Sequence, residues 1–261
     1  MQYGMPTLLE AKDIDACVIL CKELSLDFIE LNMNFPQYQT DTIDLSHYRT
    51  LSKENNLFYT FHLEEALNVC GYNQEVTTAY LNTVQGSINL AKQLNAPVLN
   101  MHMADGIYIT LPEEKVYLFR QFRELYLERL REFRDLCERS IGEDNIKICI
   151  ENCGGYQDFT QEGIELLLES SVFALTYDIG HDHSIGGVDE PFLRKHKDRL
   201  QHMHLHDALG KQNHLAIGAG EINIEDKLAL AKECHCRCVL ETKTIEGLKD
   251  SVEKLHRIID K

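Results

Sequence analysis

The stretches IKICIE, residues 146–151, and FALTYD, residues 173–178, are two short apolar runs that each end on a carboxylate. Four further runs end on a histidine or a glutamate: FYTFH at 58–62, VLNMH at 98–102, LQHMH at 200–204 and CVLE at 238–241. Short apolar runs of this kind are typical of buried strands. Carboxylates and imidazoles delivered by successive strand ends are the arrangement that builds a metal site in a parallel barrel.

Outward from these runs, apolar and longer amphipathic stretches alternate along the chain. Strands are expected near 3–7, 28–31, 58–62, 98–102, 147–151, 173–178, 200–204 and 237–241. Helices are expected near 13–24, 45–55, 75–94, 113–140, 160–169, 191–196, 224–232 and 245–259. Eight strand–helix units predict a parallel sheet closed into a (β/α)8 barrel. An open doubly wound sheet is the alternative, but no glycine-rich phosphate loop follows the first strand.

No proline- or serine-rich linker divides the 261 residues, so one domain over 1–261 is expected. The balance of 26 Lys and Arg against 42 Asp and Glu gives a net charge of −16, which repels a polyanion such as DNA at long range. The arginine-rich stretch 120–139 interleaves its arginines with acids and indicates a solvated helix face rather than a basic patch. The sequence therefore argues against nucleic acid as a partner, and it leaves a homo-oligomer open.

The location expected from the sequence is the cytoplasm. No apolar run approaches the ~18 residues needed to cross a bilayer, and the first residues lack a basic and then apolar secretory signal. Nine cysteines are an odd number spread over a long chain, which favours reduced thiols. Cys234, Cys236 and Cys238 lack the usual zinc-knuckle spacing, and buried structural cysteines are the better interpretation.

Four strand ends carry the strongest chemical signal: Glu151, Asp178, His204 and Glu241. Period-two alternation lets each of them point toward the mouth of the barrel. Any one alone is more often a cap, a surface residue or a hydrogen-bonded structural residue. Four such residues together are harder to explain as caps, surface residues or structural residues, because buried carboxylates without a cation repel one another at a cost of several kcal/mol. Three carboxylates and one imidazole suit Mn²⁺, Mg²⁺, Co²⁺ or Zn²⁺.

The segments IEN, YDIGH, HLHD, HLAIGAGEI and LET, in that order, resemble the xylose isomerase-like TIM-barrel superfamily. That group unites sugar and sugar-phosphate isomerases and epimerases with the endonuclease IV family of DNA-repair enzymes. The resemblance implies that Glu151, Asp178, His204 and Glu241 bind a divalent metal ion. It implies further that the two glutamates handle protons on opposite faces of a substrate, and that His181 contacts it.

The endonuclease branch implies additional metal ligands at four histidines, with Glu151 bridging two ions: His62, His102, His181 and His214. That branch has Asp-x-His where this chain has Gln212-Asn213-His214, and a neutral amide weakens such a site. Ketose epimerases often carry an arginine after the histidine of the seventh strand, but here Lys211 is the nearest cation. His206 and Asp207 are assigned to contacts behind the ligands or with the substrate, and a structural hydrogen bond is nearly as good an explanation.

Three functions remain open: a metal-dependent isomerase or epimerase of a small sugar or polyol, a metallohydrolase that cleaves DNA at abasic sites, and a non-catalytic barrel that retains the metal site. The loops expected around the mouth hold one lysine and no arginine, but many acids, tyrosines and amides. Such a lining suits an unphosphorylated polyhydroxy compound. The isomerase or epimerase is therefore the preferred function, and one bound ion per chain would favour it over the hydrolase.

Overall fold

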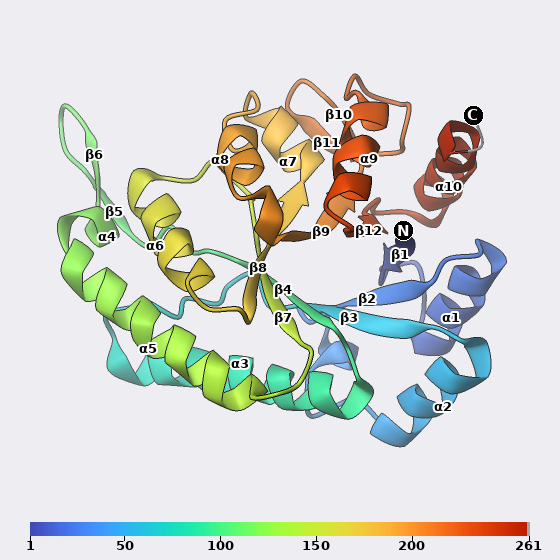
Figure 1. Cartoon of the computed structure of the whole chain (residues 1–261), viewed down its shortest axis with the longest axis horizontal. Coiled ribbons are helices and arrows are strands. Elements are labelled where there is room, and N and C mark those ends of the chain that lie inside the picture. The colour runs from blue at the N-terminus through green and yellow to red at the C-terminus, as the bar shows by residue number, and fades with distance from the viewer. Residues whose placement is uncertain (260–261) are drawn as a thin grey trace.

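A computed structural model describes residues 1–259 and shows eight parallel strands closed into a barrel (Figure 1). Around the barrel the order is β1-β12-β9-β8-β7-β4-β3-β2, so the first and the last strand of the chain close the sheet. The barrel strands are β1 (Gln2–Pro6), β2 (Phe28–Asn32), β3 (Phe58–His62), β4 (Val98–His102), β7 (Lys147–Glu151), β8 (Phe173–Asp178), β9 (Leu200–Leu205) and β12 (Arg237–Leu240). The expected (β/α)8 barrel is confirmed.

Helices cover the outside of the barrel and connect its strands. They are α1 (Ile14–Glu23), α2 (Leu45–Asn55), α3 (Gln74–Leu94), α4 (Leu118–Gln121), α5 (Arg123–Ile141), α6 (Asp158–Leu168), α7 (Ile179–Ser184), α8 (Glu190–Lys195), α9 (Ile224–Glu233) and α10 (Ile245–Ile259), with short 3₁₀ turns at Pro36–Tyr38 and Lys197–Arg199. Local chemistry sets several of their ends. Asp44 caps α2 by accepting from the amides of Ser46 and His47, and Asn73 caps α3 in the same way.

The sequence prediction was wrong between β4 and α5. A helix was expected near 113–140, but α5 begins only at Arg123 and follows the short helix α4. The preceding residues form an antiparallel hairpin of β5 (Tyr108–Thr110) and β6 (Lys115–Tyr117), which projects from the body of the molecule at the upper left of Figure 1. A second hairpin, β10 (Asp207–Leu209) with β11 (Gln212–Leu215), and the short helix α7 were also not predicted. All three additions lie after barrel strands, where they build the rim.

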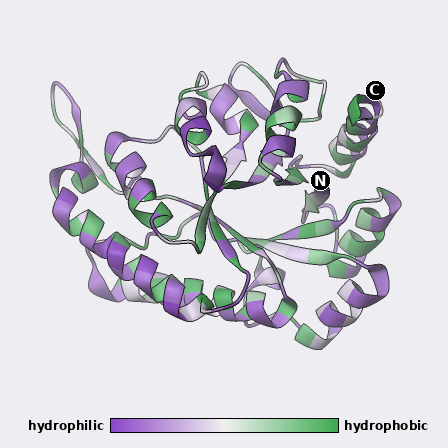
Figure 2. Ribbon diagram, in the orientation of Figure 1, coloured by the Kyte–Doolittle hydropathy of each residue, from purple (hydrophilic) through white to green (hydrophobic). Residues whose placement is uncertain are grey.

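Apolar side chains fill the space between the barrel and its helices. Figure 2 shows this distribution, with apolar residues on the strands and on the inward stripes of helices whose outer faces are polar. Leu130 and Phe133 of α5 and Ile164 of α6 are fully buried. Burial of such a side chain contributes about 1.5–3 kcal/mol. The helices are therefore held to the barrel mainly by the hydrophobic effect.

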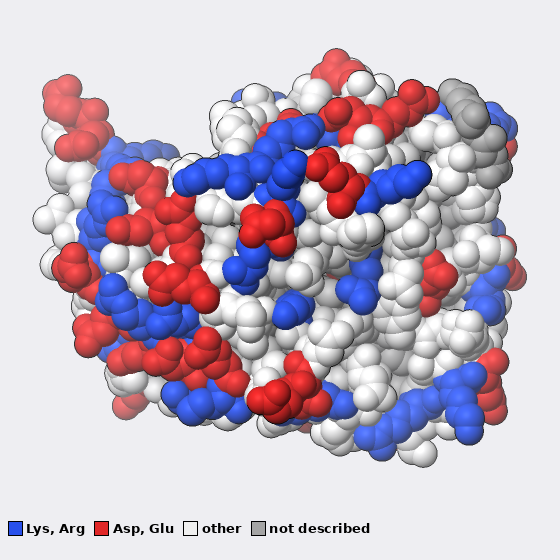
Figure 3. Space-filling view, viewed as in Figure 1, with Lys and Arg blue, Asp and Glu red and all other residues white. Residues whose placement is uncertain are grey.

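The charged outer face carries cross-helix ion pairs. Arg120 pairs with Asp158 at 2.7 Å and Arg134 with Glu169 at 2.6 Å, so arginines of the 120–139 stretch reach acids on and beside α6. Figure 3 shows the resulting mixture of positive and negative residues on this face. Within residues 1–259, no helix has the length and apolar character needed to cross a membrane. The nine cysteines are free thiols, and Cys236 and Cys238 are buried as expected.

A close approach between β1 and β2 yields a test of the barrel packing. Gly4 lies opposite Phe28 in the parallel register, and a Cβ at Gly4 would lie 2.5 Å from the ring of Phe28. That ring is fully buried and stacks on Phe58 with centroids 5.0 Å apart, so it has no free space to move into. We expect Gly4→Ala to lower the free energy of unfolding by about 1–3 kcal/mol, as overpacking does. Urea denaturation of the metal-free protein measures this change.

A matched glycine gives the control. Gly86 lies within α3, and a Cβ there would meet only ordinary contacts at 3.8 Å with Thr40. Gly86→Ala should therefore leave stability unchanged or raise it by up to about 1 kcal/mol, because alanine favours helix. Equal effects of the two substitutions would show that the β1–β2 approach is not a packing constraint.

Candidate metal centre

The four strand-end residues singled out in the sequence meet inside the mouth of the barrel. One ligand atom each from Glu151, Asp178, His204 and Glu241 lies within 4.8 Å of all the others. The Nδ1 atom of His204 is 3.0 Å from Glu241 Oε2, 3.3 Å from Glu151 Oε1 and 3.6 Å from Asp178 Oδ2. All four residues are buried, with Glu241 the most exposed at 8%. The parallel strands β7, β8, β9 and β12 bring them together because their C-terminal ends share one rim.

The donor atoms of this quartet fit a small divalent cation. Glu151 Oε1, His204 Nδ1 and Glu241 Oε2 are buried and have no hydrogen-bond partner in the described part of the chain. Buried polar atoms are almost always satisfied, so three that point at one another call for a shared partner. A metal with bonds of about 2.1 Å holds tetrahedral ligands about 3.4 Å apart, which is close to the spacing seen here. The quartet therefore has the spacing and chemistry of a metal site.

Glu151 lies between this quartet and a second group of side chains. Its Oε2 atom is 3.4 Å from His62 Nε2 and 3.3 Å from His102 Nε2, while the buried amide of Asn100 donates to the same oxygen. The His62 ring donates Nδ1–H to the carbonyl of Leu63 at 2.9 Å, which leaves Nε2 toward the carboxylate. His102 is 16% exposed and so borders solvent. Both rings therefore lie within reach of Glu151.

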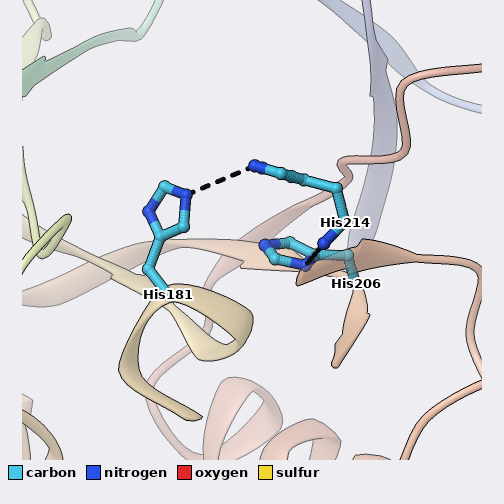
Figure 4. A group of neighbouring side chains, drawn as sticks. All are labelled: His181, His206 and His214. Carbon is cyan, nitrogen blue, oxygen red and sulfur yellow. Dashed lines mark hydrogen bonds between the residues drawn. The ribbon is translucent and has the colours of Figure 1, made fainter. Parts of the chain in front are cut away.

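Three further histidines form a cluster beside Asp178 (Figure 4). His206 Nε2 lies 2.9 Å from Asp178 Oδ1, and its Nδ1 accepts from the backbone amide of His214 at 2.8 Å. Both ring nitrogens of His206 therefore have partners, and its role is to hold Asp178. His181 Nε2 and His214 Nε2 lie 3.3 Å apart, and His181 Nδ1 is 3.6 Å from both Glu151 and Asp178. His214 Nδ1 also lies 3.3 Å from the carbonyl oxygen of Glu241, so His181 Nδ1 is the ring nitrogen of the cluster that has no hydrogen-bond partner among the described residues.

The protonation state of each residue in the quartet depends on the charges of its neighbours. Burial alone would raise the pKa of Glu151, but the positive charge on His204 and His102 outweighs it and holds this pKa well below its usual range. For His204, burial opposes protonation, yet the carboxylates of Glu151 and Glu241 raise its pKa well above the usual value. Burial lowers the pKa of His214 to about 4, so this ring is neutral and can donate an electron pair at pH 7. Positive charge at the centre of the quartet is strongly favoured.

Some site residues were not predicted from the sequence. Glu30 lies in the middle of β2, and its Oε1 atom is 2.9 Å from Nε2 of His204. Lys243 follows the last strand and places its ammonium 2.8 Å from Glu241 Oε1. It is a cation near the mouth that the count of charged residues in the expected loops did not include. Asn152 ties β7 to β8 through hydrogen bonds to the backbone of Asp178. Glu30 could have been recognised as a candidate site residue because it is a charged residue inside an otherwise apolar strand.

One predicted residue, Asp207, lies away from the quartet. Asp207 is buried and accepts from the amides of Ala208, Gly218 and Ile222, so it anchors the loop that carries His214. That is the structural hydrogen bonding considered for it above. Gln212 is exposed at the start of β11.

Comparison with known proteins supports the same assignment of the fold. The family described as xylose isomerase-like TIM barrel matches residues 18–260. An uncharacterized protein of Methanocaldococcus jannaschii is 26% identical over 215 residues, which cover 80% of each chain. The sequence resemblance to this family is confirmed.

Solved structures share the whole fold at low sequence identity. A D-tagatose 3-epimerase-like protein superimposes with a TM-score of 0.79 at 23% identity, covering 100% of this chain and 97% of that one. The 3-keto-D-glucoside 4-epimerase of E. coli gives 0.76 at 13% identity and covers 100% of both chains. The IolI protein, solved with a bound zinc atom, gives 0.75 at 16% identity and covers 100% and 98%. The chain belongs to the xylose isomerase-like TIM-barrel family.

Proposed function

We propose that this protein is a divalent-metal-dependent isomerase or epimerase of a small unphosphorylated sugar or polyol. The observation that carries the proposal is the convergence of four ligand atoms from four strand ends, three of them buried without a hydrogen-bond partner among residues 1–259. Glu151, Asp178, His204 and Glu241 would hold the ion. The donor set of three carboxylates and one imidazole suits Mn²⁺, Co²⁺, Zn²⁺ or Mg²⁺.

In the proposed reaction, one glutamate removes a proton from the substrate and the other delivers a proton to it. A bound cation would polarise a carbonyl and its neighbouring hydroxyl and so acidify the C–H bond between them. Glu151, held ionised by its histidine neighbours, takes that proton as the base. Glu241 would deliver a proton to the opposite face after taking one from solvent, and Glu151 would then release its proton to solvent, so that both carboxylates return to their starting state. Lys243 lies against the outer oxygen of Glu241 and keeps that carboxylate oriented toward the mouth.

The surface and the mouth favour a small neutral substrate. The net charge of −16 opposes a polyanion, and the face in Figure 3 carries residues of both signs. Lys243 is 57% exposed and already paired, so it adds little charge for a phosphate. Neighbours in structure include a D-psicose 3-epimerase solved with D-tagatose, which fits the proposed class of substrate.

A hydrolase of the endonuclease type is the second candidate, and one observation favours it. His62 and His102 both face Glu151 Oε2, and their ligand atoms with that of Glu151 lie within 4.8 Å of one another. A second cation there would share Glu151 with the first, as in sites that clamp the attacking and leaving oxygens of a phosphodiester. If the protein is an isomerase, these two rings instead form hydrogen bonds with hydroxyl groups of the sugar.

The number of bound ions separates the two candidates. We expect one Mn²⁺ or Co²⁺ per wild-type chain and none in Asp178→Asn, because that substitution removes an anionic ligand from the quartet. Elemental analysis of dialysed protein measures the ratio. Asp158→Asn, a matched change at an exposed residue paired with Arg120, should keep the full ion content. Two or three ions per wild-type chain would contradict the isomerase proposal.

Proton transfer provides the direct test of activity. With a panel of ketoses in deuterated water, the metal-loaded protein should exchange a carbon-bound hydrogen of its substrate, detected by NMR. Glu151→Gln and Glu241→Gln should each slow exchange by at least about 10²-fold, the usual contribution of a general base or acid. Glu253→Gln on the exposed face of α10 serves as the control.

A parallel incubation with abasic duplex DNA distinguishes the hydrolase. We expect no strand cleavage by the same preparation. Cleavage that depends on Glu151, without deuterium in any sugar, would replace the isomerase with the nuclease.

A further inference from the structure

A carboxylate that the proposed reaction does not use lies directly beneath the quartet. Glu30 of β2 is 2% exposed. Its Oε1 is 2.9 Å from His204 Nε2, its Oε2 is 2.8 Å from His202 Nε2, and Thr60 donates its hydroxyl to Oε2 at 3.0 Å. An isolated buried carboxylate is strongly destabilising, so this group is held by its three partners.

The two nitrogens of the His204 ring face different surroundings. Nδ1 faces Glu151 and Glu241, whereas Nε2 lies 2.9 Å from Glu30 Oε1, a contact between charged groups that is not aligned as a hydrogen bond. A neutral imidazole carries a proton on one nitrogen and a lone pair on the other. Carboxylates face both nitrogens, so Glu30 favours the form with the proton on Nε2 once a cation in the quartet has displaced the proton from Nδ1. The lone pair on Nδ1 then points into the quartet, which is the form of the ring that binds a metal.

The same three side chains could be read as a metal site of their own, since their ligand atoms lie within 4.8 Å of one another. Their surroundings argue against it. Glu30, His202 and His204 are 0–2% exposed, and Glu30 Oε2 already has two partners. Glu30 therefore acts on the ring of His204 and not on an ion.

We propose that Glu30 is a positioning residue, which fixes the orientation and the tautomer of His204 for metal binding and is itself held by His202 and Thr60. The inference rests on the proposed metal site. Residues behind a metal-binding histidine typically change metal affinity by about 10- to 100-fold when they are replaced. No contact between Glu30 and substrate is required, so its effect on the ring of His204 is measured as a change in metal affinity.

The test is Co²⁺ binding to wild type and to Glu30→Gln, a substitution that keeps the shape and removes the charge. Calorimetry gives the dissociation constant, and the visible absorption of Co²⁺ reports the ligand geometry. We expect binding by Glu30→Gln to be about 10- to 100-fold weaker, with an altered Co²⁺ spectrum. Asp189→Asn is the matched control, since it removes the charge of another carboxylate that is 1% exposed but lies outside the quartet and its partners. It should bind Co²⁺ like wild type.

Unchanged affinity and spectrum in Glu30→Gln would overturn the role of Glu30 while leaving the metal site intact. Absence of Co²⁺ binding by wild type would overturn the site and this role together. Circular dichroism establishes whether the variant is folded. If it is not, the crystal structure of Zn²⁺-loaded wild type decides: zinc on Nδ1 of His204 with Nε2 bonded to Glu30 supports the role, and zinc on Nε2 overturns it.

Discussion

Like charges buried in one small volume are the constraint on which this structure depends. Four carboxylates lie almost out of contact with water inside the mouth of the barrel, where their mutual repulsion would be costly without positive charge. Histidine side chains supply that positive charge. A ring nitrogen lies within 3.6 Å of each of the four carboxylates, which are Glu30, Glu151, Asp178 and Glu241. The large number of histidines at the mouth follows from this need for positive charge, and a cation at the centre of the quartet would complete the balance.

Much of this arrangement was readable from the sequence. The strands β3, β4, β7 and β8 begin and end at the predicted residues, because each is an apolar run that stops abruptly at a polar side chain. Parallel strands place their C-terminal ends on one rim, so residues that end separate runs could be expected to meet. Glu151 and Glu241 are 90 positions apart in the numbering, yet that rule alone brought them together.

The remainder depends on contacts that local sequence does not encode. Glu30 occupies the middle of an apolar strand, and its partner His202 is 172 residues away, so only the closed barrel reveals their pairing. The hairpin of β5 and β6 is exposed, and the acids at 113–114 followed by a long amphipathic stretch favoured a helix over the strands that form there. Lys243 was not predicted as a residue of the mouth because it follows the last strand directly, where the sequence shows no long loop.

The closure of the barrel by β1 and β12 also sets an order of events during synthesis. At 5–20 residues per second, roughly 10–50 s pass between the emergence of β1 and that of β12 from a ribosome. During this interval one edge of β1 has no strand beside it, and the nascent chain presents an open edge to its neighbours. The last residue of the quartet, Glu241, arrives together with the strand that closes the sheet. Capture of an ion by all four ligands would therefore mark a chain whose barrel has closed.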